Sequence, residues 1–315
     1  MDANRPMTLQ HISCLCLCLL LACGPAAADD PLPVHQLAPG MFIHRGANEE
    51  TSTANEGAIA NVGFIVGKRC VAVIDTGGSM ENGQRLRLAI RQKTPVPICY
   101  VINTHVHPDH VFGNAAFVAD APTFIGHQRL AAAMQARGAY YRKALARELG
   151  EDVAAASTLI APGKTVAADM EIDLGGRLLQ VRAWPTAHTD NDLTVFDRQS
   201  GTLWLGDLLF EQRVPSLDGS LNGWLAAMET LRTLPARLVV PGHGAPSTEW
   251  PGAMRSQERY LQALQRDVRK AIRDKQTLAQ AVETAAHEER PRWLLFDNYH
   301  AHNVTGAYTE LEWEN

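Results

Sequence analysis

The stretch "THVHPDH" at residues 104–110 concentrates side chains that bind metal ions. Histidine and carboxylate groups are the usual ligands of borderline divalent cations such as zinc. In an extended or turn conformation His105 and His107 point the same way, whereas Asp109 and His110 fall on a neighbouring side, beyond the proline. The spacing therefore predicts two adjacent metal positions, and a polar surface loop with unrelated histidines is the weaker interpretation.

The segments around this stretch predict strands that alternate with helices. Runs rich in valine and isoleucine, bounded by glycine, predict strands at 61–67 and 70–78. Leucine and isoleucine at helical spacing predict an amphipathic helix at 81–93, and a continuous apolar run predicts a buried strand at 98–104. Asp75 and the THVHPDH stretch thus both follow strand ends, where α/β proteins place their chemistry.

The second half of the chain carries three more side chains of ligand type. Two hairpins are predicted at 171–186 and 193–207, and a short strand at 236–244. His188 follows the first hairpin, Asp207 ends the second, and His243 leaves the short strand. Four predicted strand ends therefore deliver histidines and aspartates, and we expect these side chains to meet.

From about residue 251 the pattern becomes helical. Helices are predicted at 256–275, 277–289 and 302–315, with Thr277 as an N-cap. The last helix is expected to pack Tyr308, Leu311 and Trp313 against the body of the protein. About 65 residues is near the lower limit for an independent core, so we interpret 251–315 as a helical C-terminal extension of the same domain.

The composition limits the classes of protein to which this chain can belong. The 315 residues are 46% hydrophobic and 20% charged, which is enough for one large core or two modest ones. The formal charge of -5 and the scattered basic residues give no basic stripe of the kind that follows a phosphate backbone. We therefore expect a small-molecule substrate and no nucleic-acid partner.

Residues 1–28 have the pattern of a secretory signal peptide. Arg5 precedes the apolar run "CLCLCLLLAC", which small residues follow as far as Ala28. That run has about ten residues, well under the roughly 20 that span a bilayer, so no transmembrane helix is expected in the mature chain. Alternatively, "LLAC" resembles a bacterial lipoprotein box, which would place a lipid anchor at Cys23. Either signal predicts a periplasmic or otherwise exported protein.

Two cysteines, Cys70 and Cys99, lie outside the signal region. An exported protein can form disulfides. Each cysteine precedes an apolar run, so the two would lie at matching ends if those strands are neighbours. Because sequence does not give the geometry that a disulfide needs, two buried free thiols is the slightly preferred interpretation, and the disulfide stays open.

The ligand-type residues and their surroundings resemble the metallo-beta-lactamase superfamily over roughly residues 34–250. The "THVHPDH" stretch is similar to the H-x-H-x-D-H signature of that family, and "VAVIDTG" resembles the strand that precedes the signature. The resemblance implies an α/β fold, an αββα sandwich of two mixed sheets with helices outside. It gives Asp75 a supporting role beside the ligand loop and not the role of a ligand.

The same resemblance implies a site for two zinc ions. One ion would be bound by His105, His107 and His188, and the second by Asp109, His110 and His243, with Asp207 bridging both. Two such ions share a hydroxide that attacks the substrate. Asp109 would also be catalytic, because a carboxylate ligand can orient the water or accept its proton.

The implied reaction is hydrolysis of an ester, a thioester or a similar bond in a small substrate. Beta-lactamases of the superfamily usually lack a bridging aspartate, so Asp207 makes the chain more similar to hydroxyacylglutathione hydrolases and related thioester, phosphoester or sulfate-ester hydrolases. A beta-lactamase-type amide hydrolase is one alternative. A mononuclear iron persulfide dioxygenase, which uses the same motif with only some of these ligands, is another.

Three segments of the chain resemble a narrower group within this superfamily, the exported SoxH-like zinc metallohydrolases of quinoprotein relay systems. They are the signal, "AHTDNDLTVFD" and the ending "HAHNVTGAYTELEWE". This resemblance implies association with a quinoprotein system. His302, Asn303 and Tyr308 would then reach over the site as substrate contacts, or serve packing and helix capping. No other substrate-binding residue is assigned.

Overall fold

The computed structural model describes residues 30–314. The predicted signal peptide, residues 1–28, and the alternative lipid anchor at Cys23 lie outside the described residues. Within 30–314, no helix combines the length and the apolar character that crossing a bilayer requires.

Seven strands form the first sheet and lie side by side in chain order. They are β1 (His35–Ala38), β2 (Met41–His44), β3 (Val62–Val66), β4 (Val71–Ile74), β5 (Ile98–Ile102), β6 (Thr123–His127) and β7 (Lys164–Val166). Strands β1 to β4 run antiparallel to their neighbours, and β4 to β7 run parallel. The three strands predicted before the THVHPDH stretch correspond to β3, β4 and β5.

Five strands form the second sheet, in the order β12-β11-β10-β9-β8. They are β8 (Asp169–Asp173), β9 (Leu178–Ala183), β10 (Leu193–Asp197), β11 (Thr202–Phe210) and β12 (Leu238–His243). Strands β11 and β12 are parallel, and the other neighbours are antiparallel. The two predicted hairpins correspond to β8–β9, which turns at the left-handed Gly175 and Gly176, and to β10–β11.

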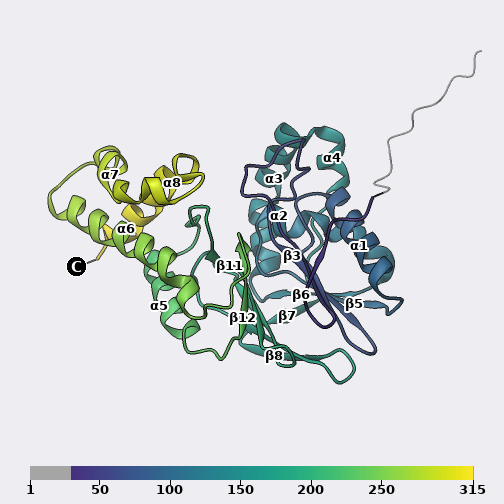
Figure 1. Cartoon of the computed structure of the whole chain (residues 1–315). Helices are drawn as coiled ribbons and strands as arrows, with labels where there is room; N and C mark the ends of the chain where they lie inside the picture. The colour runs from purple at the N-terminus through teal and green to yellow at the C-terminus, as the bar shows by residue number, and fades with distance from the viewer. Residues whose placement is uncertain (1–29, 315) are drawn as a thin grey trace, which may run out of the picture.

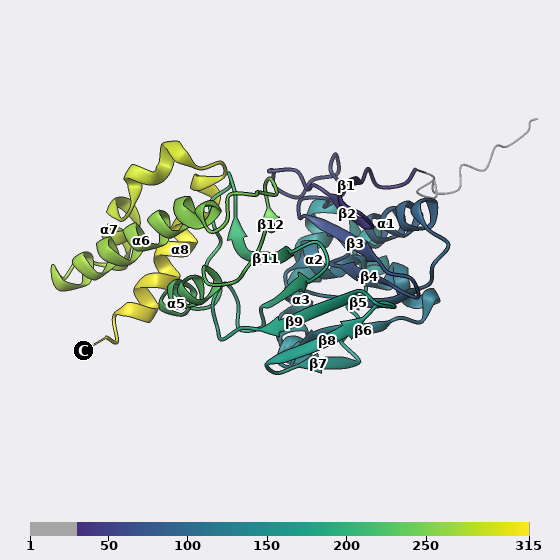
Figure 2. The same cartoon turned by 60° about the horizontal axis from the view of Figure 1, so that its bottom comes forward.

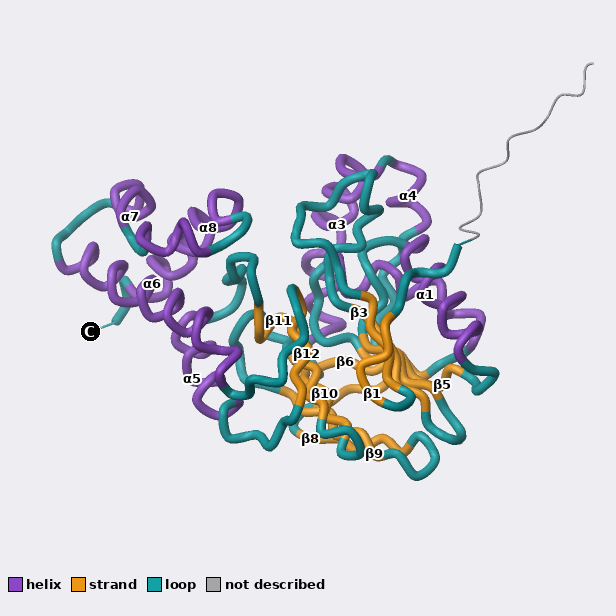
Figure 3. The backbone as a smooth tube through the Cα atoms, in the orientation of Figure 1, coloured by secondary structure: helices purple, strands orange, loops and turns teal. Residues whose placement is uncertain are grey.

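The inner faces of the two sheets pack on each other. Their buried side chains share one apolar cluster, which includes Ile65, Ile74 and Ile102 from the first sheet and Val181 and Trp204 from the second. Removal of this apolar surface from water is the main force that holds the layers together. The expected sandwich of two mixed sheets with outer helices is confirmed (Figures 1 and 3).

Helices cover the outer faces of both sheets. The described helices are α1 (Met80–Lys93), α2 (Pro108–Val111), α3 (Leu130–Leu149), α4 (Glu151–Ala156), α5 (Leu221–Leu231), α6 (Arg255–Arg273), α7 (Leu278–Thr284) and α8 (Phe296–Leu311), with short 3-10 helices η1 (Phe112–Asp120), η2 (Gly252–Met254) and η3 (His287–Arg292). Helix α1 buries Leu86 and Ile90 over the first sheet, and α5 buries Trp224 over the second. Ser79 caps α1, which corresponds to the predicted helix.

The C-terminal helices extend the cluster over the second sheet. Helices α5, α6 and α8 share apolar contacts with β11 and β12, and form a lobe beside the sandwich (Figures 1 and 2). Thr277 begins α7 with a capping box to Gln280, as predicted. Helix α8 begins at Phe296, earlier than predicted, and buries Leu311, but Trp313 is 79% exposed because it lies beyond the helix end. The prediction that Trp313 packs on the body is therefore wrong, and the boundary of the extension stays a prediction.

Asp207 does not end its strand, contrary to the sequence prediction. Strand β11 continues to Phe210, and its pairing with β12 is irregular between Trp204 and Phe210. Within this irregularity Gly206 has a left-handed φ of 53°, and a Cβ there would lie 2.7 Å from the Thr104 side chain. Glycine permits both the conformation and the close approach. The carboxylate of Asp207 thereby lies beside the THVHPDH loop from within the strand.

Cys70 and Cys99 form a disulfide, with Cα atoms 5.5 Å apart. Strands β4 and β5 are parallel neighbours, and Val71 pairs with Ile98, so each cysteine lies next to a paired residue. The register of these strands, which sequence does not specify, brings the two sulfur atoms together. The preference for two free thiols was therefore wrong.

Candidate metal centre

The seven predicted ligand residues meet at one edge of the sandwich. His105, His107, His188 and Asp207 form one group, and Asp109, His110 and His243 form a second, and in each group the donor atoms lie within 4.8 Å of one another. The contributing elements are the loop after β5, the start of α2, the loop between β9 and β10, strand β11 and the last residue of β12. Strand ends and one irregular strand thus assemble the donor cluster, by which we mean these seven side chains.

The loop after β5 is held by Asp75, which follows β4. The Asp75 carboxylate accepts hydrogen bonds from the Thr104 backbone N at 2.8 Å and from Thr104 Oγ1 at 2.7 Å. It also accepts from His110 Nδ1 at 2.8 Å. These contacts are those expected of a residue that holds the loop in place and is not itself a metal ligand.

Each of the five histidines has one ring nitrogen held by the protein and the other directed into the cluster. The holding partners are Thr104 Oγ1 for His105, Asp218 for His107, Asp75 for His110, the Ser216 carbonyl for His188 and the Ile59 carbonyl for His243. Such bonds fix the orientation of each ring and the nitrogen that carries hydrogen, as in metal-binding histidines.

The donor atoms of the first group have the separations of tetrahedral ligands. His107 Nδ1 lies 3.1 Å from His105 Nε2 and 3.0 Å from His188 Nε2. Asp207 Oδ2 lies 3.7 Å and 3.6 Å from the same two Nε2 atoms. Bonds of about 2.0–2.1 Å in a tetrahedral zinc site place ligand atoms roughly 3.4 Å apart, so this group fits a zinc ion.

The second group shares a carboxylate oxygen with the first. Asp207 Oδ2 lies 3.4 Å from His243 Nε2, which in turn is 3.3 Å from Asp109 Oδ2. His110 Nε2 and Asp207 Oδ1 are both buried and lie 3.1 Å apart. Neither atom forms a hydrogen bond with any of the described residues. Two buried polar atoms without partners are costly, and a cation between them would satisfy both. The donors therefore fit a divalent ion in this group as well.

The electrostatics differ between the two groups. Burial lowers the pKa of His188 to about 3 and holds the pKa of His105 well below its usual value, so both rings are in the neutral form that binds metals. Burial opposes protonation of His110 too, but the carboxylates of Asp207 and Asp109 outweigh it and raise the pKa of that ring. The carboxylates of Asp207 and Asp109 thus favour a positive charge at the position of the second group.

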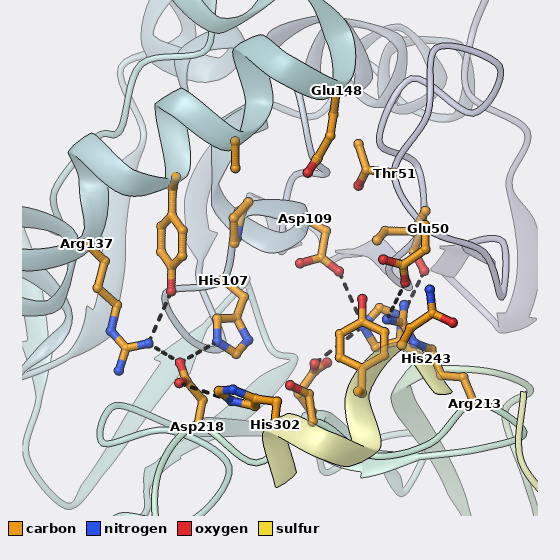
Figure 4. A pocket seen from close by; sticks show the side chains of 18 of the residues that line it. Glu50, Thr51, His107, Asp109, Arg137, Glu148, Arg213, Asp218, His243 and His302 are labelled. Carbon is orange, nitrogen blue, oxygen red and sulfur yellow. Dashed lines mark hydrogen bonds and ion pairs between the residues drawn. The ribbon is translucent and has the colours of Figure 1, made fainter. Parts of the chain in front are cut away.

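A cavity of about 750 Å³ opens over the donor cluster, which is a suitable size for a small molecule. Helix α3 contributes Arg137 and Tyr141 to its wall, the loop after β11 contributes Arg213, and α8 contributes Tyr299 and His302. Figure 4 shows the ionisable groups of this wall around the donor side chains. The C-terminal helix therefore helps to line the pocket.

The family model of the metallo-beta-lactamase superfamily matches residues 56–243, which is more than half of the chain. The chain belongs to the metallo-beta-lactamase superfamily. It is 25% identical over 209 residues to a linear primary-alkylsulfatase from Pseudomonas sp. (strain ATCC 19151), a match that covers 55% of this chain and 39% of the relative. The chain thus spans well under half of the length of that curated relative.

Solved metallo-beta-lactamases share the fold. A metallo-beta-lactamase from Pontibacter korlensis superposes with a TM-score of 0.60 at 21% identity, over 73% of this chain and 99% of the other. The enzyme TMB-1 gives 0.57 at 19% identity, over 74% and 97%. DIM-1 metallo-beta-lactamase exposed to ceftazidime gives 0.58 at 15% identity, also over 74% and 97%. These solved structures support the fold, and the donor cluster gives this metallo-beta-lactamase superfamily protein a candidate metal-binding site.

The sequence did not reveal Asp218, a pocket residue that orients the His107 ring of the donor cluster. Its carboxylate accepts from His107 Nε2 at 3.0 Å and forms an ion pair with Arg137. His302 Nε2 lies 3.9 Å from the same carboxylate. Asp218 belongs to no motif, and its only sequence signal is its place in the loop after the strand that carries Asp207.

The three C-terminal residues considered as substrate contacts separate into two kinds. His302 lines the pocket. Asn303 is buried, where it accepts from the Leu217 backbone N at 2.8 Å and donates to the Pro215 carbonyl. Tyr308 donates to the Gln276 carbonyl at 2.9 Å. Asn303 and Tyr308 thus contribute to packing and not to substrate contact, which is one of the two roles that the sequence left open for them.

Proposed function

We propose that this protein is an exported dinuclear zinc hydrolase that cleaves an ester, a thioester or a similar bond in a small substrate. One observation carries the proposal: two groups of buried donors share the oxygen Asp207 Oδ2, at 3.4 Å from His243 Nε2 and at 3.6 Å from His188 Nε2. A carboxylate placed between two sets of imidazoles is suited to hold two ions side by side.

The side chains would divide the work as follows. Zinc ions held by the two groups would polarise a substrate oxygen and lower the pKa of the attacking water. Burial opposes ionisation of Asp109, but His110 and His243 outweigh it and hold the pKa of this carboxyl well below its usual range. Asp109 lines the pocket and is ionised, so it can orient the water or accept its proton. Asp207 is almost fully buried and serves to hold the ions.

Ester chemistry is preferred to amide chemistry for two reasons. Asp207 occupies the shared position, and the curated relative is named as an alkylsulfatase, which supports an ester-type bond. The likeness to beta-lactamase structures supports the fold alone, because those identities are 15–21%. The name of this relative supports testing a sulfate ester, a class that the sequence resemblance already included, beside carboxylic esters and thioesters.

Export is supported by the N-terminal sequence and by the disulfide. The Cys70–Cys99 bond fits an oxidising compartment such as the periplasm. The proposed similarity to SoxH-like hydrolases, and the association with a quinoprotein system that it implies, rest on sequence resemblance in the signal, at residues 187–197 and at the end of the chain. The intact mass of the exported protein tests the signal, since a chain beginning at Asp29 supports the signal peptide and a lipid on Cys23 supports the lipoprotein alternative.

Metal quantification on the purified mature protein is the deciding experiment. We expect two zinc ions per chain, and turnover of at least one member of a panel of thioesters, lactones, beta-lactams, phosphodiesters and sulfate esters. Chelation should abolish that turnover, and zinc should restore it. One iron per chain with oxygen uptake on glutathione persulfide would replace the proposal by the dioxygenase. Activity retained after complete metal removal would refute it.

A further inference from the structure

Residues 215–218, which we call the ring-holding loop, orient two histidines of the first group of donors. The Ser216 carbonyl accepts a hydrogen bond from His188 Nδ1 at 2.7 Å, and the Asp218 carboxylate accepts from His107 Nε2 at 3.0 Å. The loop lies between β11 and α5 and contains no helix or strand of its own. Its backbone groups therefore need partners from elsewhere in the chain if the loop is to keep one shape.

Asn303 of α8 supplies such partners on both sides of Ser216. Its Oδ1 accepts from the Leu217 backbone N at 2.8 Å, and its Nδ2 donates to the Pro215 carbonyl at 2.6 Å. Pro215 and Leu217 are buried, and the Asn303 side chain is fully buried as well. Breaking bonds at buried polar groups is costly, so one amide side chain fixes the backbone that presents the Ser216 carbonyl.

A buried chain of hydrogen bonds fixes the orientation of the Asn303 amide. His300 Nε2 lies 2.8 Å from the Ala285 carbonyl, which can only accept, so this nitrogen carries the hydrogen of the ring. Burial lowers the pKa of His300 to about 4, so the ring is neutral near pH 7. His300 Nδ1 therefore accepts from Tyr260 Oη at 3.0 Å, and Tyr260 Oη accepts from Asn303 Nδ2 at 2.8 Å. The amide thus directs its nitrogen to Tyr260 and its oxygen to the Leu217 backbone.

The rings of the second group are held by other segments. His110 Nδ1 donates to Asp75, which follows β4, and His243 Nδ1 donates to the Ile59 carbonyl, which precedes β3. Among the described residues, these two ring partners lie outside the ring-holding loop. A change at Asn303 should therefore reach the first group of donors and not the second.

We propose that Asn303 is a positioning residue, which fixes the ring-holding loop and, through it, the His188 and His107 rings in the geometry that binds the first metal ion. The C-terminal helices thereby support the metal centre, although all seven donors precede them. Asn303 acts by orientation alone and contacts neither the metal nor the substrate. The inference rests on the zinc binding of the proposed function and does not depend on which substrate is cleaved.

Competition with a chromogenic zinc chelator tests the proposal on the two-zinc protein. Asn303→Leu keeps the approximate size of the side chain and removes both bonds to the loop. We expect it to weaken the binding of one zinc ion about 10- to 100-fold, the usual loss when a metal-binding histidine loses its support, and to leave the other ion unchanged. Tyr308→Phe is the matched control, because it removes a hydrogen bond from the same helix to Gln276. Equal affinities in the two variants, or an equal loss of both ions in Asn303→Leu, would overturn the proposal.

Histidine-selective NMR of the zinc-loaded protein identifies the ion that is weakened. At saturating zinc, Asn303→Leu should shift or broaden the Nδ1–H signal of His188, which is bonded to the loop. The Nδ1–H signals of His110 and His243 should stay in place. A general loss of stability would alter all three signals alike, so that result, or no change in any of them, contradicts a positioning role.

Tyr260→Phe keeps the proposal testable if Asn303→Leu does not fold. It removes the hydroxyl that orients the amide but keeps both bonds between Asn303 and the loop. We therefore expect a smaller effect, a weakening of the same zinc ion by about two- to fivefold. A zinc affinity equal to that of Tyr308→Phe would count against the proposal.

Zinc binding and ester turnover are measured separately, which distinguishes this inference from the proposed function. If the protein binds two zinc ions and Asn303→Leu weakens one, but no ester is cleaved, the positioning role stands and the hydrolase function fails. If esters are cleaved and Asn303→Leu binds both ions normally, only the positioning role fails. A protein that binds no zinc would overturn both.

Discussion

Arg137 and Arg213 line the same pocket, but the fold treats their charges differently (Figure 4). Arg137 on α3 forms an ion pair with Asp218, and that carboxylate also holds the His107 ring. Among the described residues, the carboxylate that pairs with Arg213, on the loop after β11, is that of Glu50, at 3.8 Å. A neutralised arginine can position a neighbouring group, whereas one without a bonded acceptor is available to a ligand. The difference teaches that one residue type can be paired closely with a carboxylate on one wall of a pocket and loosely on the other.

The comparison assumes that the reacting centre lies between the two arginines, and Asp109→Asn tests that assumption. The amide cannot accept a proton from water, so we expect turnover to fall about 100- to 10,000-fold. Circular dichroism and the unfolding midpoint should match the unaltered protein, because Asp109 lies at the pocket and outside the apolar clusters. Near-normal turnover at full zinc content would place the reacting centre elsewhere.

Removal of the Cys70–Cys99 disulfide should lower the free energy of unfolding and leave both walls of the pocket unchanged. Cys70 and Cys99 are separated by 29 positions, and closing a loop of that length restricts the unfolded chain by about 3–4 kcal/mol. The double variant Cys70→Ser/Cys99→Ser should lose that free energy of unfolding, measured by chemical denaturation. Its turnover should be unchanged at 25 °C, because the bond lies away from the pocket. Two reactive thiols in the unfolded, unreduced protein would show that the bond is absent.

Asp218→Asn would break the support on the Arg137 wall. The amide keeps the size of the side chain but loses the charge that pairs with Arg137 and accepts from His107. Loss of such a supporting partner typically lowers metal affinity or activity about 10- to 100-fold. Zinc content after dialysis against a weak chelator measures the effect. Unchanged zinc content and unchanged turnover would show that Asp218 does not support the donor cluster.

Arg137→Met should have the smallest effect. The His107–Asp218 bond persists without the arginine, and a partly exposed ion pair contributes little, so turnover should fall about two- to fivefold. Steady-state kinetics at full zinc content measure the change. A fall as large as that of Asp218→Asn would show that the Asp218 carboxylate depends on Arg137 for its position.

The donor cluster could be predicted because its residues lie in or near recognisable strands and belong to short motifs. The spacing of His105 and His107 and the glycines around His243 are local signals. The strand end at Asp207 was mispredicted because the apolar pattern does not show that β11 continues through an irregularity at Gly206. Strand registers, which also produce the disulfide, depend on tertiary packing.

The pocket wall could not be predicted for a related reason. Asp218, Arg213 and Tyr299 belong to no motif, and they meet only because a loop after β11 pairs with the segment before α8. An arginine in a sequence gives no sign of whether a carboxylate neutralises it. That property depends on contacts between residues that are about 80 positions apart or more, as for Arg137 with Asp218.

The bridge between Arg213 and Leu294 has a consequence for how such a protein can change over time. All seven donor residues precede residue 244, whereas Tyr299 and His302, which face the same pocket, come from α8. The reactive centre and one part of the pocket wall are thus encoded in separate stretches of the gene. Mutations at the pocket-facing positions of the last helix can retune what the pocket accepts while the seven donor residues are inherited intact.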